Sequence, residues 1–340
     1  MDKKDIKNFT IEELRKELNN IREASYRAGQ IFDWLYKKGV FEFSKMNNLP
    51  SPLKDKLCRV YRVGSIRLKE HLKSSDGTEK FLFELSDGHF IETVLIYSGS
   101  RKTVCLSTQV GCKFRCAFCA SGTKGFTRSL TTSEMLDQIL FLQRVLSHNI
   151  TNFVFMGMGE PLDNYKNLSK AILIMNSTEA LEIGARRITV STCGVVPGIE
   201  KFKHLGIQVN LSISLHAVDN RLRDILVPIN KVYPLEKLIA ACEDYISEAD
   251  RRITLEYVLI KGKNHSSKDA AGLSRIAKSL EAKVNLIPYS SVSGKDFEAP
   301  LKKEMLAFKA ALVKDRINVT MRESKGGDIR AACGQLAMRT

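Results

Sequence analysis

Three cysteines in one short stretch are the residues of this sequence best suited to chemistry. Cys112, Cys116 and Cys119 stand at the spacing C-x3-C-x2-C inside the stretch GCKFRCAFCASGTKGF, residues 111–126. Thiolates this close together on one loop can all face a single inorganic centre, as in the loops that hold iron–sulfur clusters. Because the loop supplies only three thiols, we predict an iron–sulfur cluster with one iron that the protein does not ligate.

Two other interpretations of these cysteines stay open. A closed zinc site needs four ligands, usually in two pairs, yet no second Cys or His pair stands nearby, and His89 and His148 are isolated. The cysteines can also be buried structural residues, but three of the chain's eight cysteines fall in this one loop. The missing fourth ligand makes the iron cluster the favoured interpretation.

The charge of the chain favours a polyanionic partner. Lys and Arg outnumber Asp and Glu by 53 to 38, a net charge of +15, and such a balance is typical of proteins that bind RNA or DNA. No Asp or Glu occurs between residues 101 and 128, and the basic residues there are Arg101, Lys102, Lys113, Arg115, Lys124 and Arg128. A solvated basic loop is the ordinary explanation. Because these charges surround the cysteines, we expect instead a phosphate-bearing substrate at this mouth.

The bulk composition is that of an ordinary soluble protein, with 44% hydrophobic and 27% charged residues in a chain of 340. No apolar run reaches the length of a membrane span, and the start, MDKKDIKNFT, lacks a signal-peptide core. We therefore expect a cytoplasmic protein without a membrane partner. In that compartment eight cysteines indicate metal binding or catalysis rather than a disulfide framework.

Two differently patterned segments precede the cysteine loop. To about Lys73 the chain has the pattern of short helices, and Thr10 with Glu13 forms a capping box. We predict that residues 1–75 are a helical accessory domain that docks RNA. Residues 76–97 are predicted to form a β-hairpin extension, because two apolar runs flank an Asp-Gly turn signal. Glu92 lies within the second run, and an edge-strand position facing solvent is the ordinary explanation for it.

From residue 98 onward the chain alternates strands and helices, which indicates a parallel α/β sheet with right-handed crossovers. The predicted strands are Thr103–Ser107, Asn152–Met156, Arg187–Ser191, Val209–Leu215, Ile253–Leu259 and Ala282–Ile287. The predicted helices are Thr132–Leu146, Tyr165–Met175, Val196–Lys203, Leu235–Ala249, Lys268–Ser279 and Lys302–Lys314. We assign residues 98–340 to one domain, although no linker marks its start.

Ligands of such sheets collect at the carboxyl ends of the strands. The cysteine loop follows the first predicted strand, and Gly157-Met158-Gly159-Glu160 follows the second. Ser191 ends the third strand, and the run Ser214-Leu215-His216 ends the fourth. Each motif is weak alone, since glycines make turns, serines cap helices and a histidine can be a core residue. Their convergence predicts a single site at this edge of the sheet.

The cysteine spacing resembles that of the radical S-adenosylmethionine (SAM) superfamily, and further motifs are similar to its RlmN family of RNA methyltransferases. These motifs are CLSTQVGCKFRCAFCASGTKGFTRSLT, FMGMGEPLDN, RRITVSTCGVVPGI, SISLHA, LVPIN and GGDIRAACGQL, and the first segment adds RAGQIFDWLYKKG. The resemblance covers nearly the whole chain. It implies a partial (βα)6 radical SAM barrel and a [4Fe-4S] cluster whose open iron binds SAM.

The resemblance also implies an activity, which is methylation of carbon 2 of adenine. The substrates would be an adenine in the peptidyl-transferase centre of 23S rRNA and the adenine 3′ of the anticodon in some tRNAs, with two SAM molecules consumed each time. Carbon 2 lies between two ring nitrogens and offers no useful nucleophile. A radical route avoids that barrier, and the cofactor supplies the hard chemistry while the protein positions it.

Catalytic roles follow from the same resemblance. The three loop cysteines match the cluster ligands, and Cys333 matches the cysteine that first takes a methyl group from SAM. A radical derived from a second SAM then removes hydrogen from that methyl group, which adds to carbon 2. Cys105 matches the cysteine that resolves the RNA–protein thioether and leaves a Cys105–Cys333 disulfide. Glu92 matches the base that removes the carbon-2 proton.

SAM contacts are implied for a second set of residues, which are Gly159, Glu160, Ser191, Ser214, Leu215, His216 and Ser290. Ser290 departs from the family, which usually has Asn there; a hydroxyl is shorter and offers fewer hydrogen bonds than an amide. Cys58, Cys193 and Cys242 match nothing catalytic, and we expect them to be small buried hydrophobic residues.

Two alternatives remain at this stage. The related Cfr type methylates carbon 8 of the rRNA adenine with the same cysteines, and Pro161 and the helical N-terminal pattern favour the carbon-2 group. An RNA-binding protein without catalysis, with a zinc-stapled loop, would need neither Cys333 nor Cys105 near Cys112. The enzyme would also require an electron donor of flavodoxin or ferredoxin type, and we expect a monomer.

Overall fold

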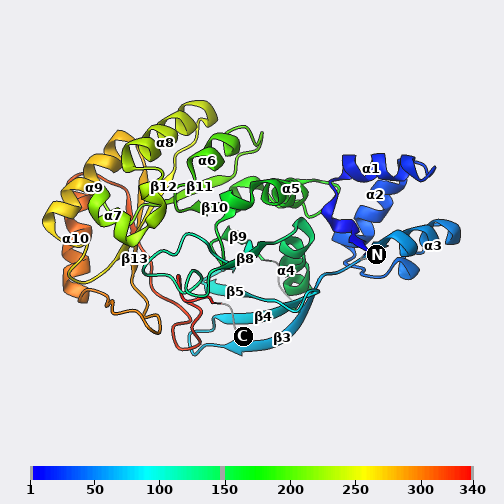
Figure 1. Ribbon diagram of the computed structural model, residues 1–340, viewed down its shortest axis with the longest axis horizontal. Coiled ribbons are helices and arrows are strands. Elements are labelled where there is room, and N and C mark those ends of the chain that lie inside the picture. Colours follow the sequence, from blue (N-terminus) through cyan, green and yellow to red (C-terminus); the bar gives the residue numbers. More distant parts are fainter. Residues whose placement is uncertain (1–2, 146–149, 338–340) are drawn as a thin grey trace.

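A single ten-stranded sheet organises most of the molecule in the computed structural model, which describes residues 3–145 and 150–337 (Figure 1). The strand order is β14-β13-β12-β11-β10-β9-β6-β5-β4-β3. The seven parallel strands are β6 (Arg101–Cys105), β9 (Asn152–Phe155), β10 (Ile188–Thr192), β11 (Asn210–Ser214), β12 (Thr254–Leu259), β13 (Lys283–Pro288) and β14 (Val319–Met321). Because β14 and β3 are at opposite ends of this order, the sheet forms a partial barrel rather than a closed one.

Helices connect the parallel strands and cover the outer face of the curved sheet (Figure 1). They are α4 (Thr132–Val145), α5 (Tyr165–Asn176), α6 (Val196–Phe202), α7 (Asn220–Leu226), α8 (Leu235–Ala249), α9 (Ser267–Ser279) and α10 (Lys302–Lys314). The central strands are mostly buried, as in β12, where five of six residues are buried, which is the pattern of parallel strands covered on both faces. Burial falls toward the edge, where β14 has no buried residue. The predicted strands and helices are confirmed to within about two residues.

Some elements of this domain were not predicted. Strand β14 has three residues and helix α7 has seven, and such short segments carry little periodicity. A small antiparallel pair, β7 (Gln109–Gly111) and β8 (Phe126–Ser129), was also missed. The predicted helix end at Leu146 and the isolated His148 lie outside the described residues.

Three antiparallel strands, β3 (Ile66–Lys73), β4 (Glu79–Leu85) and β5 (Phe90–Ser98), extend the sheet beyond β6. The turn at Asp87-Gly88 is confirmed, and Gly88 adopts a φ of +83°. The prediction of helices to about Lys73 is wrong, because β3 makes the expected hairpin a three-stranded unit. Its residues alternate between half-buried and exposed, a period of two that belongs to a strand.

The N-terminal segment forms the expected helical module, seen at the right of Figure 1. It comprises β1 (Lys4–Asp5), α1 (Ile11–Asn20), α2 (Arg27–Phe32), α3 (Ser51–Val60) and β2 (Tyr61–Arg62), with a π-helical turn at Asp33–Lys37. Short 3-10 turns occur at Ile6–Asn8, Phe43–Lys45, Pro161–Asn164, Ala185–Arg187 and Pro228–Lys231. The predicted capping box of Thr10 and Glu13 is present.

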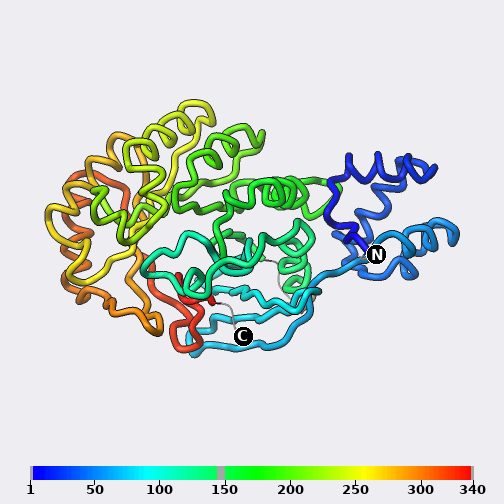
Figure 2. Tube along the Cα trace, in the orientation of Figure 1, coloured from blue at the N-terminus to red at the C-terminus, as the bar shows by residue number. Residues whose placement is uncertain are grey.

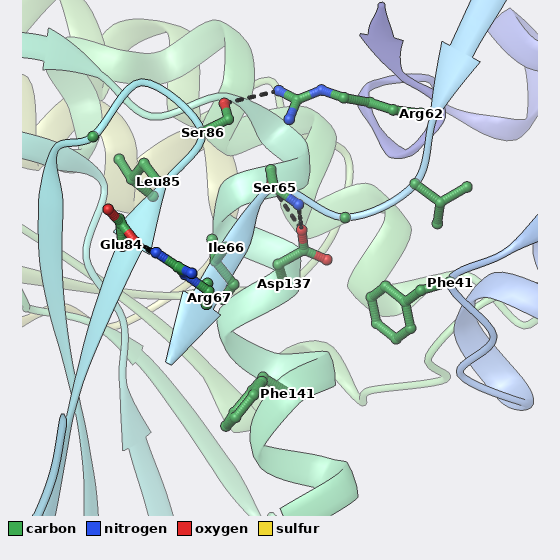
Figure 3. Close-up of a pocket in the computed structure, with 13 residues that line it drawn as sticks. Phe41, Arg62, Ser65, Ile66, Arg67, Glu84, Leu85, Ser86, Asp137 and Phe141 are labelled. Carbon is green, nitrogen blue, oxygen red and sulfur yellow. Dashed lines mark hydrogen bonds and ion pairs between the residues drawn. The ribbon is translucent and has the colours of Figure 1, made fainter. Parts of the chain in front are cut away.

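A buried charge network joins this module to the sheet domain. Lys7, with a side chain that is 0% exposed, lies 3.3 Å from Asp5 and 3.2 Å from Asp137 of α4. Asp137 also accepts hydrogen bonds from the backbone N–H and hydroxyl of Ser65, at 2.9 and 2.7 Å. Figure 3 shows Ser65 and Asp137 among the residues that line a cavity of about 730 Å³ between the module and the start of β3. Removing one member would leave a buried charge unpaired, so the network fixes the module against α4.

The C-terminal segment lies beside the antiparallel strands. In the tube view of Figure 2 its red trace runs next to the cyan strands β3 and β4. Asp328 accepts a hydrogen bond from the Ser74 hydroxyl at 2.6 Å, and Lys325 donates to the Tyr97 carbonyl at 2.6 Å. In the described parts of the chain, no helix has the length and apolar character needed to cross a membrane.

Candidate active site

The cysteine loop connects β7 to β8, and close backbone contacts hold it in shape. The Cys112 N–H donates to the Gly125 carbonyl at 2.9 Å, and the Cys119 N–H donates to the Cys116 carbonyl at 3.1 Å. Gly111 has a φ of +74°, and a Cβ there would clash with the Gly125 carbonyl. Glycine is therefore required at Gly111, both for its backbone conformation and for the close approach of the two chain segments.

The three cysteines line one cavity of about 150 Å³ together with residues from several strand ends. These residues include Gly157, Gly159, Glu160, Ser191, Ser214, His216, Glu256 and Cys333. The convergence expected from the strand order is thus present. Two residues predicted for the same site do not line this cavity. Leu215 is buried, and Ser290 lines a neighbouring cavity, where its hydroxyl lies 2.7 Å from that of Ser324.

The donor set of this cavity fits a cationic iron–sulfur cluster. Burial raises the pKa of the Cys112 and Cys119 thiols, and the neighbouring Cys116 raises both further. A bound cation reverses this effect, because a coordinating thiol is deprotonated outright. Among residues 3–145 and 150–337, no group of three or more Cys, His, Asp or Glu side chains is gathered so as to hold a metal ion. Three thiols on one loop are the ligand set of an iron–sulfur cluster that keeps one iron open to a further ligand.

Glu160 is a buried carboxylate that lines this cavity. It accepts hydrogen bonds from the backbone N–H groups of Leu162, at 3.0 Å, and Cys193, at 2.8 Å. Burial raises its pKa, while these hydrogen bonds oppose the rise. Gly159 has a φ of +96° and packs against Gln109 so closely that no Cβ would fit. The motif therefore brings backbone and carboxylate together at the end of β9.

Two serines and a second carboxylate also line this cavity. The Ser191 hydroxyl donates to Glu256 at 2.7 Å and lies 3.4 Å from the Ser214 hydroxyl. Glu256 was missed by the sequence analysis, although a lone carboxylate in the apolar run ITLEYVLI is a signal that would have found it. These groups can accept or donate hydrogen bonds to a polar cofactor.

The His216 side chain is buried with a hydrogen-bond partner, and it also lines the cavity. Its Nδ1 accepts a hydrogen bond from the Val258 N–H at 3.0 Å. Its ring packs edge-on against the Phe118 ring, with 4.7 Å between the two ring centroids. Burial lowers the pKa of His216 to about 3. The ring is therefore neutral at neutral pH and offers a flat, uncharged surface to a ligand.

Arg223 of α7 supports this wall and was also missed. Its side chain is fully buried, and it donates to the carbonyls of Cys193, at 2.8 Å, and Leu215, at 3.0 Å. It also donates to Asn230 at 2.9 Å. One guanidinium thus ties the ends of β10 and β11 to the LVPIN segment. The available sequence signal was that Arg223 lies three residues before Leu226, on the buried face of α7.

Cys333 and Cys105 line one neighbouring cavity of about 440 Å³, which also contacts Cys119. Cys105 is buried at the end of β6, whereas Cys333 is exposed on the C-terminal segment. Burial raises the pKa of Cys105 to about 12, Cys333 adds to the rise, and Arg322 opposes it. The Arg322 guanidinium lies 3.9 Å from the Cys333 sulfur.

The segment that carries Cys333 is bonded to the cysteine loop. The Ala120 N–H donates to the Gly334 carbonyl, and the Ser121 hydroxyl donates to the Leu336 carbonyl, both at 2.7 Å. Gln335 donates to the Ser291 carbonyl at 2.7 Å. The segment is therefore docked over the cysteine cavity rather than extended into solvent.

Glu92 lies on the other side of this segment, in a separate cavity of about 440 Å³ lined also by Lys80, Lys124 and Arg330. It is buried rather than facing solvent, and it forms an ion pair of 3.0 Å with Lys80. Its second carboxylate oxygen accepts a hydrogen bond from the Ala337 N–H at 3.0 Å. In this conformation Glu92 does not line the cavity of the two thiols.

The basic residues around the mouth divide into two kinds. Lys113, Arg115 and Lys124 are exposed near the cysteines, and Lys113 forms an ion pair with Asp163 at 2.5 Å. Arg128 is half-buried and forms ion pairs with Asp87 and Glu134, at 2.6 and 2.8 Å. Exposed lysines and arginines at this mouth are suited to phosphate contacts.

The three remaining cysteines divide as well. Cys193 and Cys242 are buried as predicted, and Cys193 lines the cavity with Cys112 and Cys116. The expectation for Cys58 was wrong, because it is exposed. It lies on a face of α3 where Leu53 and Leu57, not Cys58, point to the core.

Comparison with known proteins identifies similar chains along the whole length. The family model for the ribosomal RNA large subunit methyltransferase N-terminal domain matches residues 4–63, and that for the radical SAM superfamily matches residues 106–273. A probable dual-specificity RNA methyltransferase RlmN of Clostridium novyi (strain NT) is 42% identical over 334 residues, which are 98% of this chain and 97% of that protein. Its counterpart in Akkermansia muciniphila is 44% identical over 338 residues, or 97% and 94% of the two chains.

A solved structure agrees with these relatives. The crystal structure of a radical SAM methyltransferase from Sphaerobacter thermophilus superposes with a TM-score of 0.93 at 41% sequence identity. The match covers 98% of this chain and 99% of the other. The predicted radical SAM fold with a small N-terminal domain is thereby confirmed.

Proposed function

This chain belongs to the RlmN family of radical SAM RNA methyltransferases, and we propose that it methylates carbon 2 of adenine in two RNAs. The substrates are an adenine in the peptidyl-transferase centre of 23S rRNA and the adenine 3′ of the anticodon in some tRNAs. The observation that carries the proposal is the meeting of Cys333, from the end of the chain, with Cys105 in one cavity beside the cysteine loop.

We infer that Cys112, Cys116 and Cys119 hold a [4Fe-4S] cluster and that SAM occupies the cavity next to it. The chemistry supplied there is one-electron cleavage of SAM, which yields the radical that activates a methyl group. Glu160, Ser191, Ser214 and His216 bind and orient SAM, and the burial of Glu160, Ser191 and His216 excludes water. The family also implies contacts from Gly159, Leu215 and Ser290.

Cys333 is the methyl acceptor in this proposal. Its sulfur displaces the methyl group of one SAM, and the carbon–sulfur bond that forms replaces the one that breaks. The Arg322 guanidinium lies 3.9 Å from this sulfur, beside the site of the transfer. After the activated methyl group has joined carbon 2, RNA is tethered to Cys333 through a thioether.

Cys105 resolves that tether. Its sulfur attacks the Cys333 sulfur as the bond between that sulfur and the methylene carbon breaks, and the methylene takes up a proton to become the methyl group of the departing RNA. The unpaired electron left by the radical addition would pass to a cluster held by the loop cysteines, and the Cys105–Cys333 disulfide that forms must be reduced before the next turnover. Glu92 takes the carbon-2 proton before this step. The Ala337 N–H donates a hydrogen bond to Glu92 Oε2. Proton transfer to this oxygen therefore requires the C-terminal segment to move away from it.

The proposal extends to partners and domains. We infer that residues 1–75 dock RNA, that residues 76–97 support the catalytic segment and that residues 98–340 form the catalytic domain. A donor of flavodoxin or ferredoxin type supplies electrons, the protein acts as a monomer, and it works in the cytoplasm, where both RNAs are found.

Nucleoside analysis tests the function directly. The protein is reconstituted anaerobically with iron and sulfide and incubated with SAM, reductant and unmodified 23S rRNA fragment or tRNA. Digested RNA is then compared with standards of 2-methyladenosine and 8-methyladenosine. Formation of the 2-methyl product supports the proposal, and the 8-methyl product would assign the chain to the Cfr type. Stoichiometric zinc in place of iron, with no methylation, would indicate a binding protein.

Two cysteine variants test the mechanism. We expect Cys333→Ala to abolish methylation while the cluster absorbance stays intact, because this sulfur carries the methyl group but holds no iron. We expect Cys105→Ala to trap RNA covalently on Cys333, visible as a slow band on a denaturing gel. A Cys105→Ala protein that turns over normally would remove Cys105 from the mechanism.

A further inference from the structure

Lys80 and Glu92 form a buried ion pair on strands β4 and β5, where the C-terminal segment that carries Cys333 contacts the sheet. Their side chains are 4% and 3% exposed, and Lys80 Nζ lies 3.0 Å from Glu92 Oε1. They occupy neighbouring strands β4 and β5 at diagonal positions, since Lys80 pairs with Val94 and Leu82 pairs with Glu92. A buried ion pair is often no more stabilising than apolar residues of the same size, so this pair calls for a reason other than stability.

The two oxygens of the Glu92 carboxylate have different partners. Oε1 faces Lys80, whereas Oε2 accepts the Ala337 N–H at 3.0 Å. Lys80 in turn donates to the Arg330 carbonyl at 3.2 Å. Arg330 and Ala337 flank Cys333 on the C-terminal segment, so the pair is bonded to this segment on both sides of the methyl-accepting cysteine.

We propose that Lys80 is a positioning residue for Glu92, whose Oε1 it anchors so that Oε2 is the atom that receives the proton of carbon 2. This inference rests on the proposed role of Glu92 as the base. When the Ala337 N–H withdraws, Lys80 still anchors Oε1 and the carboxylate keeps its direction. The carbon–hydrogen bond then breaks, its electron pair stays with the RNA base, and the proton forms an O–H bond at Oε2.

Burial explains why the base needs this lysine. A carboxylate removed from water without a counter-charge takes up a proton and can accept no other. The charged groups that line the same cavity are Lys80, Lys124 and Arg330. Lys80 forms an ion pair with Glu92 at 3.0 Å, and it therefore supplies a counter-charge of this kind.

The test isolates the resolution step. Protein already methylated on Cys333 is allowed to form the RNA adduct, and the decay of this adduct is followed in a single turnover between about pH 5.5 and 9.5. In Lys80→Met the counter-charge is lost, so we expect the acid limb of the rate profile to move up by about 1–3 pH units. Near pH 7 this displacement slows decay by about 10- to 1000-fold, and the rate recovers at high pH. Lys80→Arg keeps the charge and should restore much of the rate.

Two controls separate positioning from structural damage. Lys69→Met removes a lysine of the neighbouring strand β3 that pairs with Glu84 near the surface, and it should leave the profile unchanged. Intact mass should show that Lys80→Met still gains one methyl group on Cys333. A Lys80→Met protein that lacks this gain would mean that the lysine shapes the whole segment, and the proposal would be overturned.

A double variant keeps the test valid if Lys80→Met alone folds poorly. In Lys80→Met/Glu92→Gln both charges are gone, which avoids an unpaired buried charge. If Lys80 acts through Glu92, the double variant decays at the rate of Glu92→Gln alone, and a further loss would refute the idea. A Glu92→Gln protein with normal decay would overturn the base assignment itself. An unchanged profile in Lys80→Met beside an inactive Glu92→Gln would overturn only the role of Lys80.

Discussion

Arg223 provides a sharp test of how the cofactor cavity is held together. In Arg223→Met the apolar stem is roughly kept while the guanidinium is lost. The carbonyls of Leu215 and Cys193 and the side-chain oxygen of Asn230 then lose donors at 3.0, 2.8 and 2.9 Å. Because these acceptors are buried, leaving each without a donor costs about 1–2 kcal/mol. We therefore expect the free energy of unfolding to fall by about 3–6 kcal/mol.

Urea unfolding of the cluster-free protein measures this loss, and a SAM titration of the reconstituted protein measures its effect on the cavity. We expect SAM affinity to fall at least about 10-fold, since the ends of β10 and β11 lose their common tie. Arg223→Lys keeps a charge but lacks the planar fork, so it should recover only part of both losses. Arg221→Met, an exposed position on the same helix, should change stability by less than about 0.5 kcal/mol. A loss below about 1 kcal/mol in Arg223→Met would refute this account of the cavity wall.

Two further predictions concern the same cavity. Gly157→Ala places a Cβ 2.7 Å from the Leu106 carbonyl, so we expect SAM binding to be lost, while Gly184→Ala, where nothing lies within 4 Å, should bind SAM normally in the same titration. His216 has a pKa lowered to about 3 by burial, whereas the unfolded chain binds this proton below about pH 6.5, so the free energy of unfolding should fall by about 1.4 kcal/mol per pH unit below that value. Urea unfolding at pH 6.5 and 5 should show a decline about 2 kcal/mol smaller in His216→Asn than in the parent, and equal declines would contradict the assignment.

Local sequence pattern predicts those elements whose structure is decided by residues close together in the chain. Six parallel strands and the helices between them follow from apolar runs and helical periodicity, and both depend on neighbours a few residues away. The rule that ligands collect at the carboxyl ends of parallel strands then placed Glu160, Ser191 and His216 beside the cysteine loop. The same reasoning failed for two segments with a polar outward face. The charged residues that alternate along β3 were predicted to be part of a helical segment, and Cys58 was predicted to be buried although it is exposed.

Contacts between distant segments were beyond that reasoning. Ser290 pairs with Ser324 and lies outside the cavity of the three loop cysteines, and Glu92 faces Lys80 and the tail instead of solvent. Arg223 was overlooked because its carbonyl partners belong to other strand ends. Such pairings depend on sheet register and chain crossing, which no window of sequence contains.

The sequence by itself determined which reactive atoms the protein has: three thiols close enough on one loop to share a cluster, and further cysteines and carboxylates at known strand ends. The spacing of residues along the chain is enough to bring these three thiols together. Only the tertiary structure decided that the C-terminal segment folds back across β4 and β5, so that Cys333 meets Cys105 while Glu92 is held behind it. That placement results from hydrogen bonds and burial between segments at opposite ends of the chain, and these exist only once the sheet has formed.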